Sequence, residues 1–183
     1  MRRAALLLAG LWVPPPLKKR ALAELAALTA EAFGCPPPAL SGLSWPERLE
    51  AYARFTASEA RRALLRPADL PLIRAGLREK ARGFGARMAR RFGAADPGQG
   101  LRLARILYGA IGIDFVGRPD GGILIRSCGF SRHYDGPVCG LVSALDEGVL
   151  SGLAGGGRLE FRERLTEGGR ACRADFIFEE PRP

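Results

Sequence analysis

The residues best suited to chemistry gather in one short segment, which runs from Cys128 to Cys139 and reads CGFSRHYDGPVC. It contains the single histidine of the chain, His133, and two of its four cysteines. Cysteine and histidine side chains serve as nucleophiles, general bases and metal ligands. Because catalytic and binding residues concentrate on loops held by a rigid scaffold, a site is expected in this segment.

Cys139 is the strongest candidate nucleophile. It lies in the first turn of a predicted helix, after Pro137, where free backbone N–H groups and the helix dipole stabilise a thiolate. Ser143 and Asp146 follow at i+4 and i+7, so they share a stripe with Cys139 at the edge of the buried face. We expect Cys139 as nucleophile, His133 as general base, and Asp146 to orient a partner or bind a substrate amine. The alternative is a small core cysteine, the commonest fate of a free thiol.

A second hypothesis belongs to a different class, a ligand- or metal-sensing module without catalysis. In it, zinc or an iron–sulfur cluster is held by Cys128, Cys139 and Cys172, because thiolates suit both. The spacing C-x4-H-x5-C matches no standard zinc-finger pattern. The phase of the last strand sends Cys172 to its apolar side, so we expect Cys139 to approach Cys172 or Cys128.

The elements that must position these residues follow from periodicity. Helical spacing predicts helices over 16–33, 44–65, 70–92, 96–109 and 135–155. Alternation and turn signals predict strands over 111–116, 123–125, 158–165 and 171–178. The predicted fold is α+β, with N-terminal helices followed by a ββαββ module whose antiparallel sheet is covered by helices. Glu163 shares the apolar phase of its strand, which predicts a buried carboxyl or, in preference, a bulge or a sheet edge.

The chain of 183 residues, 47% hydrophobic, has the length of one domain. We expect a single domain, 1–183, with a helical subregion (1–96) and an α+β module that holds the cysteine cluster (97–183). The net charge of +9 comes from residues 1–100, with 17 basic and 8 acidic residues against 11 of each in the remainder. Arginines on the 70–92 helix are expected to form a solvated face, so nucleic acid is not an expected partner.

Compartment and membrane signals are weak. Four cysteines are too few for a disulfide scaffold, which favours reduced thiols and a cytoplasmic protein. The start, MRRAALLLAGLWVPPP, resembles a short signal peptide, but no A-x-A-like site closes the apolar run. No stretch was found with the roughly 18 apolar residues of a membrane span. A homodimer is compatible with these features, although no patch in the sequence identifies an interface.

The C-terminal segment from Arg158 to Phe176, RLEFRERLTEGGRACRADF, resembles the ending of the L-2-amino-thiazoline-4-carboxylic acid hydrolase-like family. In that family an Arg-rich strand, a Thr-x-Gly turn and a Cys with an Asp/aromatic strand follow a Cys-bearing helix. A similar layout occurs in 4-vinyl reductase domains and in the sensor halves of iron–sulfur-binding regulators. The resemblance covers about residues 100–178.

This resemblance implies hydrolysis of a cyclic or amide-like C–N bond of a small molecule. It points to Cys139 and Cys172, with Asp146 and Thr166 in support. The expected substrate-binding residues are Tyr134, Arg162 and Thr166. The similarity to 4-vinyl reductase domains implies instead a module that binds a small-molecule ligand or a metal.

Overall fold

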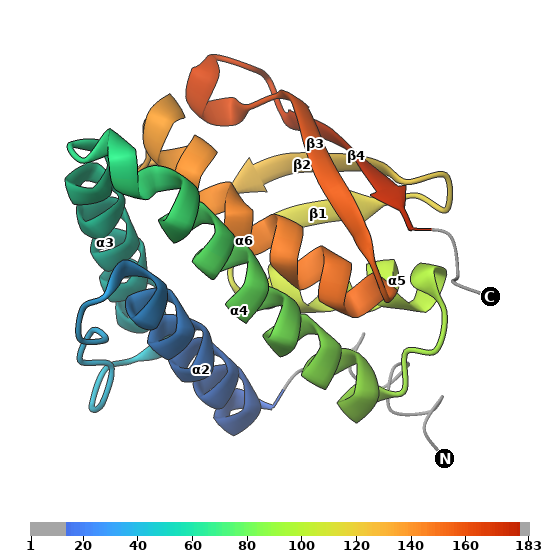
Figure 1. The fold of residues 1–183 in the computed structure, drawn as a ribbon. Helices are drawn as coiled ribbons and strands as arrows, with labels where there is room; N and C mark the ends of the chain where they lie inside the picture. The colour runs from blue at the N-terminus through green and yellow to red at the C-terminus, as the bar shows by residue number, and fades with distance from the viewer. Residues whose placement is uncertain (1–13, 180–183) are drawn as a thin grey trace.

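The structure is a computed structural model that describes residues 14–179 (Figure 1). Its helices are α2 (Pro15–Phe33), α3 (Trp45–Leu64), α4 (Leu70–Phe92), α5 (Pro97–Ala110) and α6 (Gly136–Ala154). Its strands are β1 (Ile113–Gly117), β2 (Gly122–Cys128), β3 (Gly157–Glu163) and β4 (Cys172–Phe178), with short 3₁₀ turns at Pro67–Asp69 and Leu165–Glu167. The predicted α+β class and the order of helices followed by ββαββ are confirmed. The N-terminal apolar run lies outside the described residues.

Local signals account for the starts of the two helices that flank the site. At α3, the carboxylate of Glu47 accepts hydrogen bonds from the backbone N–H and the hydroxyl of Ser44, at 2.8 and 2.6 Å. At α6, the Asp135 carboxylate accepts the backbone N–H of Val138 at 2.9 Å. Both caps satisfy N–H groups that a helix start leaves without partners, so each start is fixed by its own sequence.

The sheet is antiparallel, in the order β1-β2-β4-β3. Its inner face is apolar, and Cys172 at the start of β4 is only 7% exposed, so the predicted inward position of this thiol is confirmed. The register shifts between Phe161 and Glu163 on the edge strand β3, and Glu163 pairs with Arg173 at 3.1 Å. The predicted bulge at the edge is therefore present, and it brings the carboxylate to a basic partner.

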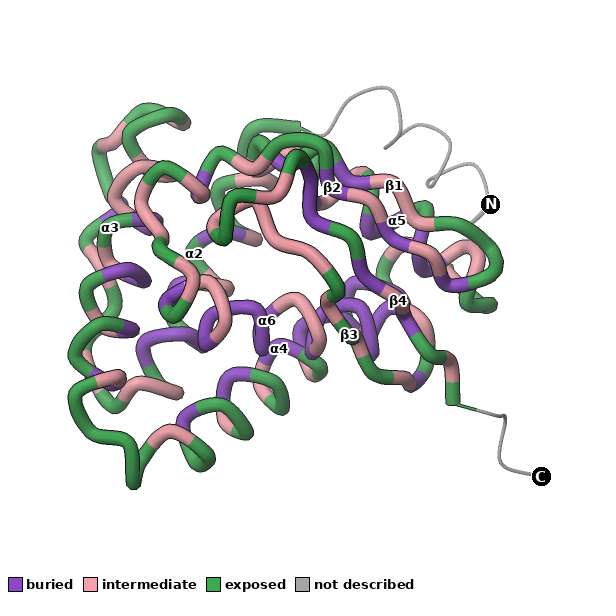
Figure 2. Tube along the Cα trace, turned by 90° about the horizontal axis from the view of Figure 1, so that it is seen from above, coloured by how far each residue is buried: buried purple, intermediate pink, exposed green. Residues whose placement is uncertain are grey.

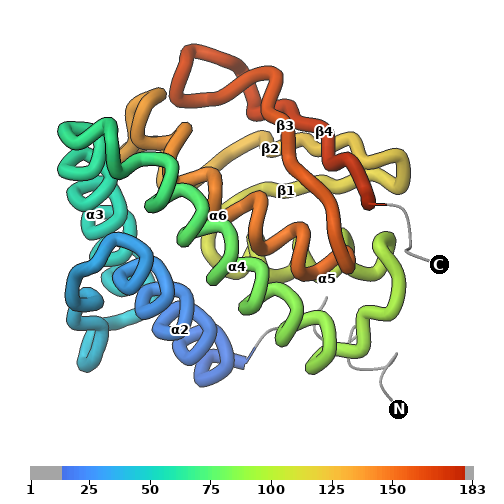
Figure 3. The backbone as a smooth tube through the Cα atoms, viewed as in Figure 1, coloured from blue at the N-terminus to red at the C-terminus, as the bar shows by residue number. Residues whose placement is uncertain are grey.

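Helix α6 lies between α4 and the sheet, as Figures 1 and 3 show. Two glycines permit this central position: a Cβ at Gly148 or at Gly152 would lie 2.2 Å from a backbone carbonyl oxygen of α4. The two backbones therefore approach more closely than alanine would allow. Buried residues concentrate along α6 and the facing side of α4 (Figure 2).

Among the described residues, α6 alone meets the length and composition of a membrane span, which corrects the expectation that no stretch would. Its most apolar window is 61% buried inside the protein. Because α4 and the sheet cover it, α6 is explained as a core helix.

Three of the six arginines of α4 are engaged with neighbouring helices. Arg78 lies 3.2 Å from Glu147 of α6, and Arg87 lies 2.6 Å from Glu24 of α2. Arg74 donates to the Gly140 carbonyl at 3.0 Å. These guanidinium groups are partly exposed, but each already has an acceptor within the protein.

Candidate functional site: a tyrosine-lined cavity

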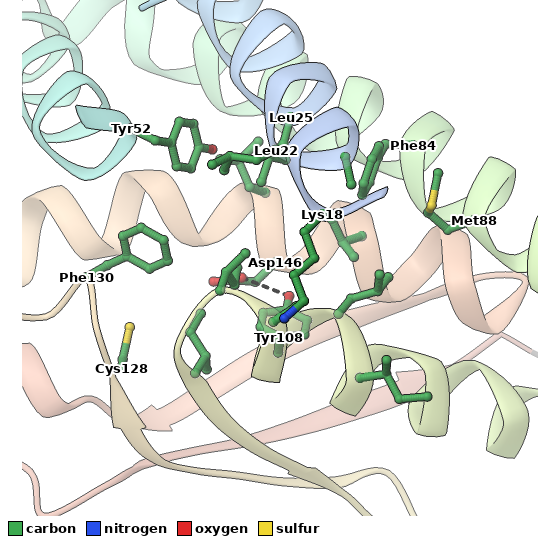
Figure 4. Close-up of a pocket in the computed structure, with 18 of the residues that line it drawn as sticks. Lys18, Leu22, Leu25, Tyr52, Phe84, Met88, Tyr108, Cys128, Phe130 and Asp146 are labelled. Carbon is green, nitrogen blue, oxygen red and sulfur yellow. Dashed lines mark hydrogen bonds between the residues drawn. The ribbon is translucent and has the colours of Figure 1, made fainter. Parts of the chain in front are cut away.

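A cavity of about 150 Å³ lies between α2, α5 and α6, beside the start of the loop that follows β2 (Figure 4). Its wall is mostly aliphatic and aromatic, with side chains such as Leu22, Leu25, Phe84 and Met88. All three tyrosines of the chain also line it, namely Tyr52, Tyr108 and Tyr134. An engineered apolar cavity of about this size binds benzene, so there is room for a ligand with one ring.

Asp146 of α6 is the one carboxylate on the cavity wall. Its Oδ1 accepts a hydrogen bond from the Tyr108 hydroxyl at 2.8 Å, the contact drawn in Figure 4. Burial raises the pKa of Asp146 to about 6, although the Tyr108 hydrogen bond and the nearby Arg164 charge act in the opposite direction. Asp146 is nonetheless only half-buried, and it is among the residues that line the cavity. The carboxylate is therefore available to a ligand.

The other two tyrosines are held by threonines. The Thr29 hydroxyl has one proton and the Leu25 carbonyl lies 2.7 Å away, so both contacts of Thr29 are satisfied when Tyr52 donates to it across 3.0 Å. Thr56 likewise donates to carbonyls of its own helix, so Tyr134 donates to Thr56. Burial raises the pKa of Tyr52 and of Tyr134, which keeps both hydroxyls protonated.

Phe130 joins these rings into an aromatic cluster. Its ring meets Tyr52 edge to face, with centroids 6.1 Å apart, and stacks on Tyr134 at the same separation. Such arrangements match the positive edge of one ring to the negative face of another. The cluster fixes the wall on the side of α3 and the loop after β2.

Cys139, Ser143 and Asp146, predicted to share a stripe of α6, all line the cavity. Within residues 14–179, the one hydrogen-bond partner of the Cys139 sulfur is the guanidinium of Arg164, at 3.9 Å. Arg164 also donates to Ser143 at 3.3 Å and lies over the Phe161 ring, 3.9 Å from its centroid. Cys139 therefore lines the cavity with the Arg164 guanidinium beside its sulfur.

The predicted general base lies elsewhere. His133 Nε2 is 3.0 Å from a Glu50 oxygen and 3.1 Å from Arg132 Nε, and it makes no hydrogen bond to Cys139. His133 lines a separate surface pocket with Arg61 and other residues of α3. The ring is engaged by α3, 83 positions away in the chain, which the local spacing of His133 and Cys139 could not indicate.

The predicted metal ligands do not form a metal site within the described residues. No group of three or more His, Cys, Asp or Glu side chains in residues 14–179 could hold a metal ion. Cys128 lines the cavity, and burial raises its pKa to about 11. Cys172 is buried, its sulfur accepts the Leu165 backbone N–H at 3.4 Å, and burial raises its pKa. Zinc or an iron–sulfur cluster therefore does not fit these residues as they stand.

The three predicted substrate-binding residues lie in different parts of the structure. Tyr134 lines the cavity. Arg162 is exposed on the outer face of the sheet and pairs with Asp175. Thr166 lies in the turn before β4 and does not line the cavity, and its hydroxyl is buried without a hydrogen-bond partner among the described residues. The cavity therefore includes only Tyr134 of this set.

Sequence analysis missed Lys18, Tyr52, Tyr108 and Phe130. Tyr52 and Tyr108 lie at buried positions of their helices, so they look like ordinary core residues. Phe130 lies in the loop after β2 and Lys18 in the first turns of α2, where no pattern marks them. One signal could have found Tyr108: an acidic residue on a mostly buried helix needs a hydroxyl or cationic partner, and the chain has three tyrosines to supply one.

No protein-family model, no curated protein and no solved structure matches the chain. The geometry of the cavity is therefore the basis for any functional assignment.

Proposed function

We propose that this protein binds a small, mostly apolar molecule of about one ring in the cavity between α2, α5 and α6. The observation that carries the proposal is an apolar cavity of about 150 Å³ whose wall includes a carboxylate with surface open to it. The cavity is partly open to solvent, and filling it recovers dispersion contacts that the lining side chains lack. A ligand of six to eight heavy atoms would bind with a Kd in roughly the micromolar to millimolar range.

The first test fills the cavity from α2. Ala21 lines the cavity, whereas Ala27 lies on the exposed side of the same helix. Ala21→Phe should abolish the binding of toluene measured by ligand-detected NMR, because the new ring occupies the ligand's volume. Ala27→Phe adds the same ring in solvent and should leave binding unchanged. Equal toluene binding by all three proteins would refute the proposal.

A second candidate function is the cysteine-dependent hydrolysis that the family resemblance implies. It is favoured by the position of Cys139, Ser143 and Asp146 on one cavity wall. The Cys139 sulfur would add to the carbon of the C–N bond, the nitrogen would leave with a proton, and water would then release the acyl group and regenerate the thiol. A base other than His133 must serve in this geometry, since the His133 ring is bonded to Glu50.

Thiol reactivity tests this candidate. If Cys139 is the nucleophile, iodoacetamide should modify it below neutral pH faster than it modifies a free thiol. Cys139→Ser should abolish the fast phase and any amidase activity. Cys35→Ser is the control, since Cys35 follows α2 and does not line the cavity. A Cys139 rate no faster than that of a free thiol would exclude the nucleophile role.

A further inference from the structure

The uncharged side chains at the end of the cavity that holds Asp146 offer few free hydrogen-bond donors. Tyr108 donates to Asp146, and Tyr52 and Tyr134 donate to Thr29 and Thr56. Each phenol has one proton, so none of the three has a donor left for a ligand.

The hydroxyl of Ser143 is also committed. It donates to the Gly140 carbonyl at 3.0 Å and accepts from Arg164 at 3.3 Å. Cys139 and Cys128 contribute thiols, which are weak donors. The nitrogen donors on the wall belong to Lys18 and Trp45, which come from the first turns of α2 and α3.

Acceptors, in contrast, remain open. Within residues 14–179, Oδ2 of Asp146 has no hydrogen-bond partner, while Oδ1 accepts from Tyr108. Asp146 is half-buried and lines the cavity. The phenol oxygens of the tyrosines can accept further bonds, and the ring faces of the aromatic cluster attract cations.

We infer that the ligand is a small aromatic or cyclic amine, bound as its cation, with its nitrogen on Asp146 and its apolar body in the aromatic part of the cavity. The inference rests on the proposed function, since it names the class of ligand for the same cavity. An anionic ligand would meet a second negative charge at Asp146. An uncharged apolar ligand would leave the second oxygen of this carboxylate without a hydrogen-bond donor.

Other charged groups lie near Asp146, but no hydrogen bond or ion pair joins any of them to its carboxylate among the described residues. Arg164 lies behind the α6 wall and is not among the residues that line the cavity. Lys18 extends from α2 toward the part of the cavity that holds Tyr108 and Asp146 (Figure 4). The other titratable groups that interact with Asp146 are thiols and phenols. Burial raises the pKa of each, so they are uncharged at neutral pH; they are Tyr52, Tyr108, Cys128, Tyr134 and Cys172.

The test compares four ligands of one shape: toluene, benzyl alcohol, benzylamine and benzoate. Isothermal calorimetry and ligand-detected NMR at pH 7.5 would give their Kd values on the full chain. Benzylamine should bind at least about tenfold more tightly than toluene or benzyl alcohol, as a charge-assisted hydrogen bond predicts, and benzoate should bind most weakly. Asp146→Asn should remove the preference for the amine and leave the toluene Kd within about twofold, which also shows that the variant is folded.

A Lys18 variant and a pH series give two further tests of the amine assignment. Lys18→Met removes a positive charge near the amine and should leave the benzylamine Kd unchanged or lower it. The contrary result is a wild-type protein that binds benzoate more tightly than benzylamine and loses benzoate binding in Lys18→Met. That result would replace the proposal with an anionic ligand held by Lys18. Benzylamine affinity should also fall as the pH is lowered through about 6, where Asp146 gains its proton, whereas toluene affinity should stay level.

The outcomes separate the two claims. Toluene binding without a preference for benzylamine would overturn the amine assignment and leave the proposed function intact. A benzylamine preference that persists in Asp146→Asn would also overturn it. Failure of all four ligands to bind the wild-type protein would overturn the proposed function, and the amine assignment with it.

Discussion

Asp146 has opposite effects on binding and on stability. Its carboxylate is desolvated in the folded protein, and this raises its pKa from 3.8 to about 6. A group whose pKa is higher in the folded state contributes stability below its unfolded pKa and loses that contribution as the pH rises through the folded pKa. The window for Asp146 is therefore about pH 4 to 6, and above it the free protein carries an ionised carboxylate that is only partly compensated.

Asp146→Asn should therefore raise the free energy of unfolding at pH 7 by roughly 1–3 kcal/mol, since a shift of about 2 pKa units corresponds to about 3 kcal/mol. The amide oxygen can still accept the Tyr108 hydroxyl. Urea unfolding at several pH values would show the difference between variant and wild type growing from pH 4 to 6 and then staying constant. Asp114→Asn, in an exposed ion pair with Arg126, should change stability by less than about 1 kcal/mol. If Asp146→Asn were less stable than the wild-type protein at pH 7, burial of the Asp146 charge would be contradicted.

At the scale of the element, the contact between α4 and α6 depends on small residues. A Cβ at Gly148 would lie 2.2 Å from the Arg78 carbonyl oxygen, and one at Gly152 would lie 2.2 Å from that of Arg82. The clashing atoms are backbone, so no side-chain movement relieves them, and one helix must shift. Because α6 carries Cys139, Ser143 and Asp146, this contact also sets the position of one cavity wall.

Gly148→Ala and Gly152→Ala should each lower the free energy of unfolding by roughly 2–3 kcal/mol, as overpacking does in a dense core. Gly140→Ala is the matched control on the same helix, because nothing lies within 4 Å of its added Cβ. It should be neutral or stabilise by up to about 1 kcal/mol through helix propensity. Guanidinium unfolding followed by circular dichroism measures all three. Equal stability of the Gly148 and Gly140 variants would show that the two helices tolerate a wider separation.

For the whole molecule, the net charge of +9 raises the question of nucleic-acid binding. Three of the six arginines of α4 have acceptors within the protein, as Arg78 has in Glu147 and Arg87 in Glu24, and these contacts interrupt the basic face. The outer face of the sheet also alternates in charge, with Arg162 paired to Asp175. Neither surface offers a continuous basic track.

Binding to duplex DNA should therefore be weak, with a Kd of roughly micromolar or above at physiological salt, and should weaken steeply as salt is added. Fluorescence anisotropy with two unrelated duplexes of equal length would measure both the affinity and its salt slope. Nanomolar binding with a preference for one sequence would show that a recognition surface is present.

Local patterns in the sequence determined the elements and the direction of several side chains. Capping residues, periodicity and turn glycines act within a few positions, so the helices, the strands and their order follow from the sequence alone. The same local geometry places Cys139, Ser143 and Asp146 on one stripe and turns Cys172 inward, because helix and strand periods fix which residues share a face. Both assignments hold in the structure.

Only the tertiary structure decided which of these residues meet. Tyr108 donates a hydrogen bond to Asp146, 38 positions away in the sequence. Glu50 of α3 lies within hydrogen-bond distance of His133, 83 positions away, so the predicted base contacts α3. The cavity itself is the space left where α2, α5 and α6 pack against one another. Such contacts depend on how helices cross and on the summed volumes of side chains from distant segments, which no pattern within one segment encodes.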